Sequence, residues 1–314
     1  MRIRQSLVTG GAGFIGSNLC RALAARGERV RVLDNFSTGH RENLAGVEVE
    51  LIEGDAADLA TARRAAEGVE CVFHQAAVPS VPRSMREPLA SHRACATATL
   101  TMLEAARQAG VRRFVYAGSS SAYGDTPTLP KIESMPPDPR SPYAAAKLAG
   151  ETYCRMYHHA YGLETVALRY FNIFGPYQDP GSPYSGVLAI FITRLLAGQP
   201  CVIYGDGETS RDFTYIENVV QANLLAREAP QASGQVYNIG CGRRVTLNWV
   251  YDFLAGELKV NLRPRYEAAR PGDVRSSLAD IQAAGRELGY MPQVQVEAGL
   301  RATIAWYRRA PEGV

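Results

Sequence analysis

Short apolar segments alternate with helix-length segments through the first half of the chain. The segments 6–11 (SLVTGG), 29–35 (RVRVLDN) and 112–120 (RRFVYAGSS) have the composition of buried strands, and the stretches between them are long enough for helices. When helices connect successive strands in this way, the strands run parallel and the helices cover both faces of the sheet. The sequence therefore predicts an α/β fold with a doubly wound parallel sheet.

The composition changes after residue 171. Residues 175–186 (GPYQDPGSPYSG) are rich in glycine, proline and tyrosine, and an apolar helical segment and a polar loop follow them. We expect residues 1–171 to form one domain and residues 172–314 to form mainly a smaller C-terminal domain, with segments near 212–240 returning to the main sheet. The two parts are expected to share a cleft.

Charge and cysteine content narrow the class of protein. The formal net charge is +3 on 314 residues and the arginines are scattered, so no basic face for nucleic acid is expected. No apolar stretch approaches the ~20 residues of a membrane span, and the first residues lack the apolar core of a signal peptide. The widely spaced cysteines predict free thiols, no metal site and a cytoplasmic location: Cys20, Cys71, Cys95, Cys154, Cys201 and Cys241.

A glycine-rich turn joins the first expected strand to the first expected helix. Gly10, Gly13 and Gly16 have the spacing G-x-x-G-x-x-G. Glycines let a backbone approach a pyrophosphate closely, and the positive end of the helix dipole favours the negative charge. A tight strand-to-helix turn without a ligand would also explain the spacing.

Acidic residues end the next two strands and favour the dinucleotide interpretation. Asp34 is placed to accept both hydroxyls of an adenine ribose and to repel a 2′-phosphate, which selects NAD over NADP. Arg31 and Arg41 lie nearby in the sequence and weaken that selection. Asp55 is placed to reach the adenine edge, although an aspartate there would equally cap the next helix.

A tyrosine precedes a lysine by four residues in SPYAAAK, residues 141–147. The chain has three lysines among 34 basic residues, so a Tyr-x-x-x-Lys pair is improbable by chance. On a helix, Tyr143 and Lys147 share one face, where the ammonium would lower the pKa of the phenol and make it a general base. A surface contact between a cation and an aromatic ring is the alternative.

Three serines, Ser119 to Ser121, follow the strand that ends near residue 118. The carboxyl edge of a doubly wound sheet is where such folds bind ligands, so a hydroxyl here would bond the oxygen that Tyr143 deprotonates. A turn or a helix cap would use the same serines.

In this order, the glycine turn, the strand-end acid, the serines and the Tyr-x-x-x-Lys pair resemble the extended short-chain dehydrogenase/reductases with their Rossmann-like domain. The likeness is greatest to the nucleotide-sugar epimerases, especially bacterial UDP-N-acetylglucosamine and UDP-glucose 4-epimerases. It continues through 169–180 (RYFNIFGPYQDP), 204–213 (YGDGETSRDF) and 270–277 (RPGDVRSS). The resemblance implies an NAD-binding domain at 1–171, a nucleotide-sugar-binding domain mainly at 172–314, and a homodimer packed through the helix of Tyr143 and the helix near 97–109.

The resemblance also implies the site residues. Tyr143 is expected to take the proton of the sugar 4-hydroxyl, Lys147 to lower the tyrosine pKa and hold the nicotinamide ribose, and Ser119 to bond O4. Hydride would pass from C4 to bound NAD and return to the opposite face, without net redox change. The expected cofactor residues are Gly10, Gly13, Phe14, Ile15, Gly16, Asp34, Asn35, Ser37, Thr38, Gly39, Asp55, Ala56, Gln75, Ala76, Ala77, Tyr143, Lys147 and Tyr170.

For the substrate, the family pattern assigns a diphosphate contact, two phosphate-binding arginines, a uridine-ribose carboxylate, and residues beside the sugar or the nucleotide. In that order they are Asn172; Arg211 and Arg270; Asp273; and Ser80, Val81, Arg83, Ser120, Val187 and Tyr204. Ser277 occupies the position that limits sugar size in the family. A small residue there leaves room for a 2-N-acetyl group and does not exclude the smaller sugar.

The resemblance therefore implies a 4-epimerase of UDP-N-acetylglucosamine and UDP-N-acetylgalactosamine that also takes UDP-glucose and UDP-galactose. One departure is Cys95, which stands where relatives have an asparagine that orders the loop beside the cofactor. A 4,6-dehydratase would need acids where Ser120 and Ser121 stand. A UDP-glucuronate 4-epimerase, with Arg83 binding the carboxylate, a strict UDP-glucose 4-epimerase and a non-catalytic NAD-binding protein remain alternatives.

Overall fold

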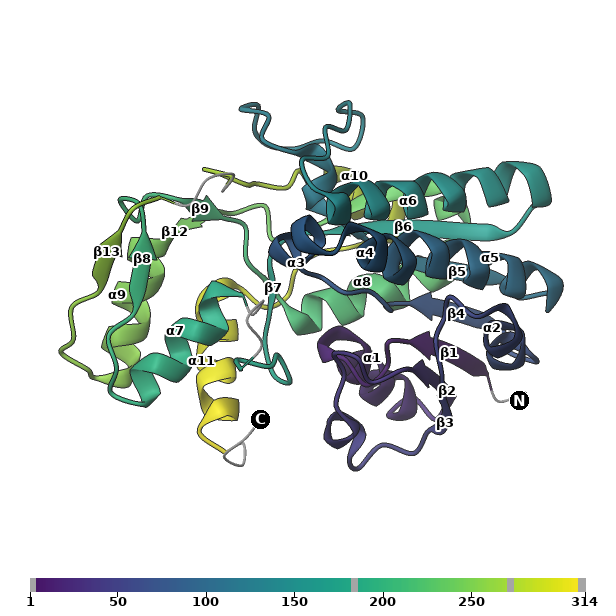
Figure 1. Ribbon diagram of the computed structural model, residues 1–314, viewed down its shortest axis with the longest axis horizontal. Helices are drawn as coiled ribbons and strands as arrows, with labels where there is room; N and C mark the ends of the chain where they lie inside the picture. Colours follow the sequence, from purple (N-terminus) through teal and green to yellow (C-terminus); the bar gives the residue numbers. More distant parts are fainter. Residues whose placement is uncertain (1–3, 182–185, 270–273, 310–314) are drawn as a thin grey trace.

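A seven-stranded parallel sheet forms the centre of the protein. The computed structural model describes residues 4–181, 186–269 and 274–309 (Figure 1). Its sheet has the order β11-β6-β5-β4-β1-β2-β3, and neighbouring strands pair in parallel. This order confirms the predicted doubly wound fold, because the chain turns back beside β1. The strands are β1 (Gln5–Thr9), β2 (Arg29–Asp34), β3 (Glu50–Glu53), β4 (Cys71–His74), β5 (Arg113–Ser119), β6 (Glu164–Tyr170) and β11 (Gln235–Ile239).

Successive side chains of each strand contribute to two different cores, since they point to opposite faces of the sheet. Leu7 and Phe114 pack against one layer of helices, and their neighbours Val8 and Val115 pack against the other. The first layer contains α2 (Leu59–Ala66), α5 (Ala98–Gln108) and α6 (Pro142–Tyr161), and the second contains α1 (Phe14–Ala24) and α8 (Ile216–Glu228). The helices therefore cover both faces, as the alternation predicted.

Shorter helical segments connect these elements. They are η1 (Arg41–Leu44), α3 (Val81–Arg86), α4 (Pro88–His92), the π-helical turn η2 (Arg93–Thr97), η3 (Ser120–Tyr123), η4 (Pro230–Ala232) and α10 (Gln282–Leu288). Gly27 and Gly110 follow α1 and α5 with φ of 75° and 67°, the left-handed conformation expected at these helix ends.

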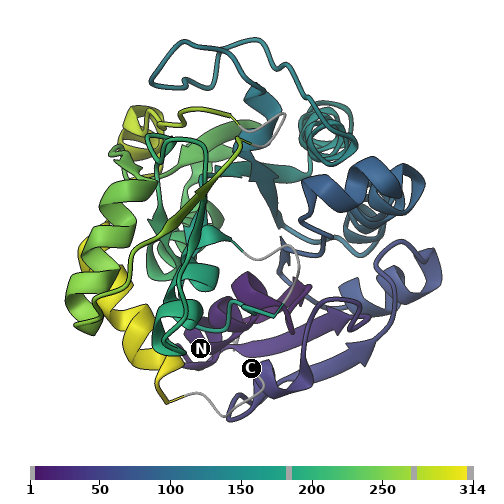
Figure 2. The same ribbon diagram turned by 60° about the vertical axis from the view of Figure 1, so that its left-hand side comes forward.

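The remaining elements pack beside the carboxyl edge of the sheet, on the left of Figure 1 and toward the viewer in Figure 2. They comprise α7 (Val187–Leu196), α9 (Leu247–Leu258) and α11 (Val296–Tyr307) with three small strand pairs. The pairs are β7 (Ile173–Phe174) with β10 (Thr214–Tyr215), β8 (Val202–Tyr204) with β13 (Arg265–Glu267), and β9 (Ser210–Arg211) with β12 (Val245–Thr246). Between β10 and β12 the chain returns to the sheet domain: it passes through α8, a helix that covers the main sheet, and β11, a strand of that sheet.

The six cysteines are free thiols, and all but Cys241 are buried. Within the ranges that the structure covers, none of the helices has the length and apolar character needed to cross a membrane.

Candidate active site

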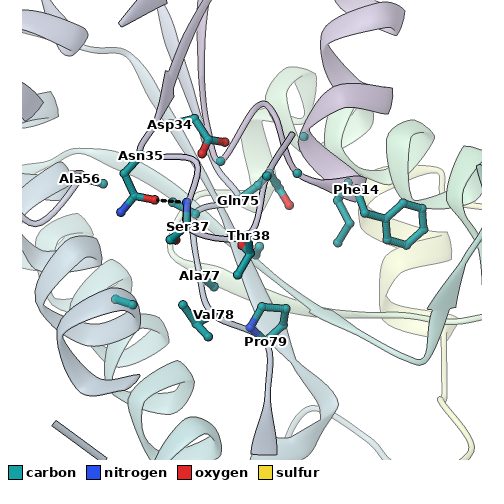
Figure 3. Close-up of a pocket in the computed structure, with 18 of the residues that line it drawn as sticks. Phe14, Asp34, Asn35, Ser37, Thr38, Ala56, Gln75, Ala77, Val78 and Pro79 are labelled. Carbon is teal, nitrogen blue, oxygen red and sulfur yellow. Dashed lines mark hydrogen bonds between the residues drawn. The ribbon is translucent and has the colours of Figure 1, made fainter. Parts of the chain in front are cut away.

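A cavity of about 580 Å³ opens at the carboxyl ends of β1, β2, β4 and β5 (Figure 3). Each residue expected to contact the cofactor lines it, from the glycine turn at one end to Tyr143, Lys147 and Tyr170 at the other. Lining residues that the motifs did not indicate include His40, Val78, Pro79, Ala94, Gln178 and Asp179. Ala94 lies in the π-helical turn η2 and Gln178 and Asp179 lie in the family-like segment 169–180, whereas the others lie in loops; only the fold brings them all to the cavity.

The glycine turn is shaped for close approach of a ligand. Gly10 has a φ of 66°, and a Cβ there would lie 2.8 Å from Cα of Ala76. A Cβ on Gly16 would lie 2.1 Å from the carbonyl oxygen of Gly10. Helix α1 then begins after Gly13 without a side-chain cap, so its first N–H groups remain available to an anion. This backbone cradle fits a pyrophosphate.

Asp34 stands beside this turn, buried at the end of β2. Its Oδ2 accepts a hydrogen bond from the Ala12 N–H at 2.9 Å and its Oδ1 accepts one from the Phe36 N–H at 2.8 Å. Each carboxylate oxygen retains acceptor capacity for a ribose hydroxyl. Figure 3 shows Asp34 next to Asn35, whose Oδ1 accepts from the Ser37 N–H at 3.1 Å.

The two arginines near Asp34 in sequence are engaged elsewhere. Arg31 forms an ion pair with Glu50 at 2.9 Å, and Arg41 pairs with Glu53 and covers the Phe36 ring at 4.2 Å. These contacts favour NAD over NADP, because a 2′-phosphate would have to compete with a carboxylate for either guanidinium.

Asp55 does not cap the next helix. Asp58 takes that role at the start of α2, where it accepts from the Thr61 N–H at 2.8 Å. Asp55 lines the cavity and pairs with Arg93 at 2.9 Å. The alternative interpretation of Asp55 as a cap is therefore wrong, and the geometry leaves it in the wall of the cavity, where its contact with the adenine stays a prediction.

Tyr143 and Lys147 share one face of α6 and both reach the cavity. The helix starts where it does because Ser141 caps it, accepting from the Ala144 N–H at 3.1 Å, and Pro142 occupies the first turn. Ser119 ends β5 beside them, and its Oγ accepts from the Ser121 N–H at 3.2 Å. Ser119 thus caps η3, which confirms that interpretation, and it also contacts Tyr143; its bond to a substrate oxygen stays a prediction.

The expected lowering of the Tyr143 pKa by Lys147 is wrong for the protein alone. Burial raises the pKa of Tyr143 above its usual value, while a hydrogen bond with Ser119 acts in the opposite direction. The Lys147 ammonium donates to the Ala117 carbonyl at 2.8 Å, and burial lowers the pKa of Lys147. Helical spacing places Tyr143 and Lys147 on one face, but the ammonium of Lys147 bonds the Ala117 carbonyl of β5 and not the phenol of Tyr143.

A second cavity of about 500 Å³ lies between the sheet edge and α7. Asn172, Val187, Tyr204 and Arg211 line it, as expected for substrate residues. Its apolar wall was not foreseen and includes Phe174, Phe191, Phe213 and Leu247. The apolar segment 187–198 signals only a buried helix, and the fold decides that this helix borders a cavity. Gln178 and Gly186 line both cavities, which therefore adjoin.

The other expected substrate residues are distributed unevenly. Ser80 and Arg83 line the first cavity, whereas Val81 is 44% exposed on α3 and lines neither. Ser120 belongs to η3 but lines neither cavity. Ser277 is joined to the second cavity through Asn172, whose Nδ2 donates to Ser277 Oγ and to the Asp212 carbonyl, both at 3.0 Å. Arg270 and Asp273 lie outside the described residues.

Asp212 is a buried carboxyl group beneath the second cavity that the motifs did not single out. It accepts hydrogen bonds from the N–H groups of Cys241, Gly242 and Ala279 at 2.8 to 3.2 Å. Burial nevertheless raises its pKa to about 6. Asp212 thereby fastens the segment of Arg211 to two loops that follow much later in the chain.

Comparison with known proteins agrees with this geometry. Residues 6–240 match the model of the NAD-dependent epimerase/dehydratase family. A UDP-glucose 4-epimerase of Mycolicibacterium smegmatis is 39% identical over 310 residues, which cover 97% of this chain and 98% of the relative.

Two solved structures are similar over nearly the whole chain. One is a UDP-N-acetylglucosamine 4-epimerase from Methanobrevibacter ruminantium, in complex with UDP-N-acetylmuramic acid, with a TM-score of 0.93 and 38% identity over 98% of this chain and 99% of that one. The other is a UDP-glucose 4-epimerase from Thermotoga maritima with UDP-glucose, with a TM-score of 0.93 and 39% identity over 97% and 99%. The predicted family and the NAD cofactor are confirmed. The chain belongs to the NAD-dependent epimerase/dehydratase family and is an NAD-dependent enzyme.

Proposed function

We propose that this enzyme is an isomerase that inverts C4 of UDP-hexoses and accepts the N-acetylated sugars UDP-N-acetylglucosamine and UDP-N-acetylgalactosamine. The observation that carries the proposal is the placement of Tyr143 and Lys147 in the wall of a cavity that adjoins a second, partly apolar one, with Ser119 behind them in contact with Tyr143. The sheet portion, residues 1–171 with α8 and β11, holds NAD. Residues 172–314 supply most of the nucleotide-sugar site.

In this mechanism the phenolic oxygen of Tyr143 takes the proton of the sugar 4-hydroxyl, and Ser119 donates a hydrogen bond to O4. NAD, when bound in the first cavity, would supply the group that accepts and returns the C4 hydride. Tyr143 then gives its proton back, so no external oxidant or base is consumed. Lys147, fixed to Ala117, holds a positive charge beside the site without itself binding the phenol.

The residues after Ser119 favour epimerisation over elimination. A 4,6-dehydratase must remove a proton from C5 and expel the 6-hydroxyl, which requires acids beside the catalytic hydroxyl. Ser120 and Ser121 occupy these positions. Neither hydroxyl has the acidity for that work at neutral pH, so the oxidised sugar is expected to be reduced again unchanged at C5 and C6.

The size of Ser277 supports acceptance of a 2-N-acetyl group. Its hydroxyl accepts from Asn172, which lines the second cavity, so Ser277 lies one contact away from that cavity. An open site does not exclude UDP-glucose and UDP-galactose, so we propose that these are also substrates.

One observation favours a second candidate, UDP-glucuronate 4-epimerisation. Arg83 lines the cavity and would accept a sugar carboxylate. It is paired with Glu87 at 3.0 Å, however, and a carboxylate ligand would have to replace that partner. We therefore place the N-acetylated hexoses first.

Proton NMR of the anomeric signals tests these alternatives. The purified protein is incubated separately with UDP-N-acetylglucosamine, UDP-glucose and UDP-glucuronate, without added reductant. Formation of UDP-N-acetylgalactosamine supports the proposal. Conversion of UDP-glucose alone would retain the mechanism and reject the role of Ser277. Conversion of UDP-glucuronate alone would favour Arg83 as a carboxylate ligand, and no conversion of any of the three by NAD-bound protein would return us to a non-catalytic NAD-binding protein.

We also propose the homodimer that the resemblance implies, packed through α6 and α5, and we add α3 and α4, which contact α6, to its surface. Met85 and Leu89 are 63% and 85% exposed, and Met156 on α6 is 38% exposed. α3 and α4 both contact α6, so the exposed apolar side chains of the two short helices lie on elements packed against it. Light scattering is expected to give twice the chain mass for the native protein and the single mass for Leu89→Glu. A native monomer at micromolar concentration would contradict this assignment.

A further inference from the structure

The turn after β5 contains a contact between two serines that the proposed mechanism leaves unused. Ser119 Oγ lies 2.8 Å from Ser121 Oγ, and it also accepts a hydrogen bond from the Ser121 N–H at 3.2 Å. The two hydroxyl groups and the Ser121 N–H group of this contact all belong to one tight turn, in which Ser119 caps η3. The geometry of Ser119 is therefore set largely by Ser121.

The direction of the bond between the two hydroxyls decides what Ser119 can do. A serine hydroxyl has one hydrogen to donate and two lone pairs that accept. The Ser121 N–H takes one lone pair of Ser119. If Ser119 donated to Ser121, its only hydrogen would be used within the turn and none would remain for the phenol or for sugar O4.

If Ser121 donates instead, both lone pairs of Ser119 are used and its hydrogen must point elsewhere. Tyr143 faces Ser119, so the hydrogen is directed toward the phenolic oxygen and the place where sugar O4 would lie. Two donors on one hydroxyl oxygen also polarise its O–H bond, which strengthens the bond that Ser119 gives to an anion.

We propose that Ser121 is a positioning residue: its hydroxyl donates to Ser119 Oγ and thereby aims the Ser119 proton at Tyr143 and at the reacting sugar oxygen. This inference rests on the proposed 4-epimerase function for its catalytic consequence. The orientation of Ser119 toward Tyr143 is a property of the protein without substrate and is testable by itself.

The ionisation of Tyr143 reports this orientation. The titratable groups around it are Lys147 on α6, Tyr116 on β5 and Cys95 in the π-helical turn η2, with His74 below Lys147. None of them is altered by a change at Ser121. Loss of the Ser121 hydroxyl weakens the bond from Ser119 to the phenolate, so the pKa of Tyr143 should rise.

The test is ultraviolet difference titration of tyrosine ionisation in the NAD-bound enzyme, with Tyr143→Phe subtracted in each background. We expect Ser121→Ala to move the Tyr143 transition upward by about half a pH unit to one unit, since one hydrogen bond is altered. Ser121→Thr, which keeps the hydroxyl, should restore the native transition. An unchanged transition in Ser121→Ala, or an equal shift in both variants, would overturn the proposal.

Kinetics then separate this role from a structural one. With UDP-N-acetylglucosamine, Ser121→Ala should lower kcat about fivefold with KM nearly unchanged, and the acidic limb of the pH profile should move up with the titration. A raised KM with an unmoved limb would show that Ser121 merely supports the turn. If the native enzyme converts no UDP-sugar, the proposed function fails, while the titration still decides the orientation of Ser119.

Discussion

The Nζ atom of Lys147 lies 2.8 Å from the carbonyl oxygen of Ala117, and this bond connects α6 to the last part of β5. The lysine is only 4% exposed, so its ammonium is fixed below the cavity. Ser119, Tyr143 and Lys147 are thus placed by the end of β5 and by α6, and the turn after β5 adds the contact of Ser119 with Ser121.

Asp34→Ala should weaken NAD binding and reduce discrimination against NADP. The change removes the acceptors of the Ala12 and Phe36 N–H groups as well as those expected for the ribose, so the turn itself loosens. We expect NAD affinity to fall about tenfold or more, as the loss of charge-assisted hydrogen bonds implies. Fluorescence titration with NADH and NADPH measures both effects. An NADH affinity equal to that of the native protein would contradict the position assigned to the adenine ribose.

Glu151→Ala should strongly destabilise the fold. Glu151 forms a two-pronged ion pair with Arg169 at 2.7 and 2.8 Å, and the two side chains are 7% and 4% exposed. Removing the acid leaves a buried guanidinium without its partner, which costs about 3 to 5 kcal/mol in the free energy of unfolding. Glu257→Ala is the matched control, because its pair with Arg301 is exposed and is worth about 0 to 1 kcal/mol. Urea unfolding compares the two, and similar losses would contradict the burial argument.

Asp212 should give the fold an unusual pH dependence. Its carboxyl pKa is about 6 in the folded chain and 3.8 in the reference state, so the folded protein binds the proton more tightly. Stability from this group is therefore present at low pH and is lost as pH rises from about 4 to about 6, by about 3 kcal/mol.

Asp212→Asn isolates this dependence from that of other acids. The amide cannot accept all three backbone bonds, so the variant should be less stable at every pH. The difference between the two proteins in the free energy of unfolding should be largest near pH 4. It should shrink toward pH 7, where the native carboxylate is charged and buried. Denaturant unfolding of both proteins between pH 4 and pH 7 measures this difference. A difference that grows with pH would contradict the raised pKa of Asp212.

Ser277→Tyr should narrow the substrate range. A phenol at this position fills the space proposed for the 2-N-acetyl group and also breaks the bond from Asn172. We expect kcat/KM for UDP-N-acetylglucosamine to fall by at least about tenfold relative to that for UDP-glucose. Ser277→Ala removes only the hydrogen bond and should leave the ratio near that of the native enzyme. Equal losses for both sugars in Ser277→Tyr would show that this position does not limit sugar size.

The features that the sequence predicted well are local. The glycine turn, the strand-end Asp34 and the Tyr143–Lys147 spacing each lie within one element or at one junction, where helix and strand geometry alone decide which groups share a face. The cofactor cavity is built at the ends of such elements, and the expected cofactor residues therefore line it. The roles of these residues in binding remain predictions that the experiments above address.

Other features depend on segments that meet only in the folded chain. The aromatic wall of the second cavity draws Phe174, Phe191 and Phe213 from separate elements, and Asn172 meets Ser277 across 105 residues. The sequence by itself determined the fold class, the glycine turn and the shared face of Tyr143 and Lys147, because these follow from short-range periodicity and backbone freedom. Only the tertiary structure decided that Lys147 bonds Ala117 and that Asp212 is buried, because burial and hydrogen-bond partners are set by which distant segments pack together.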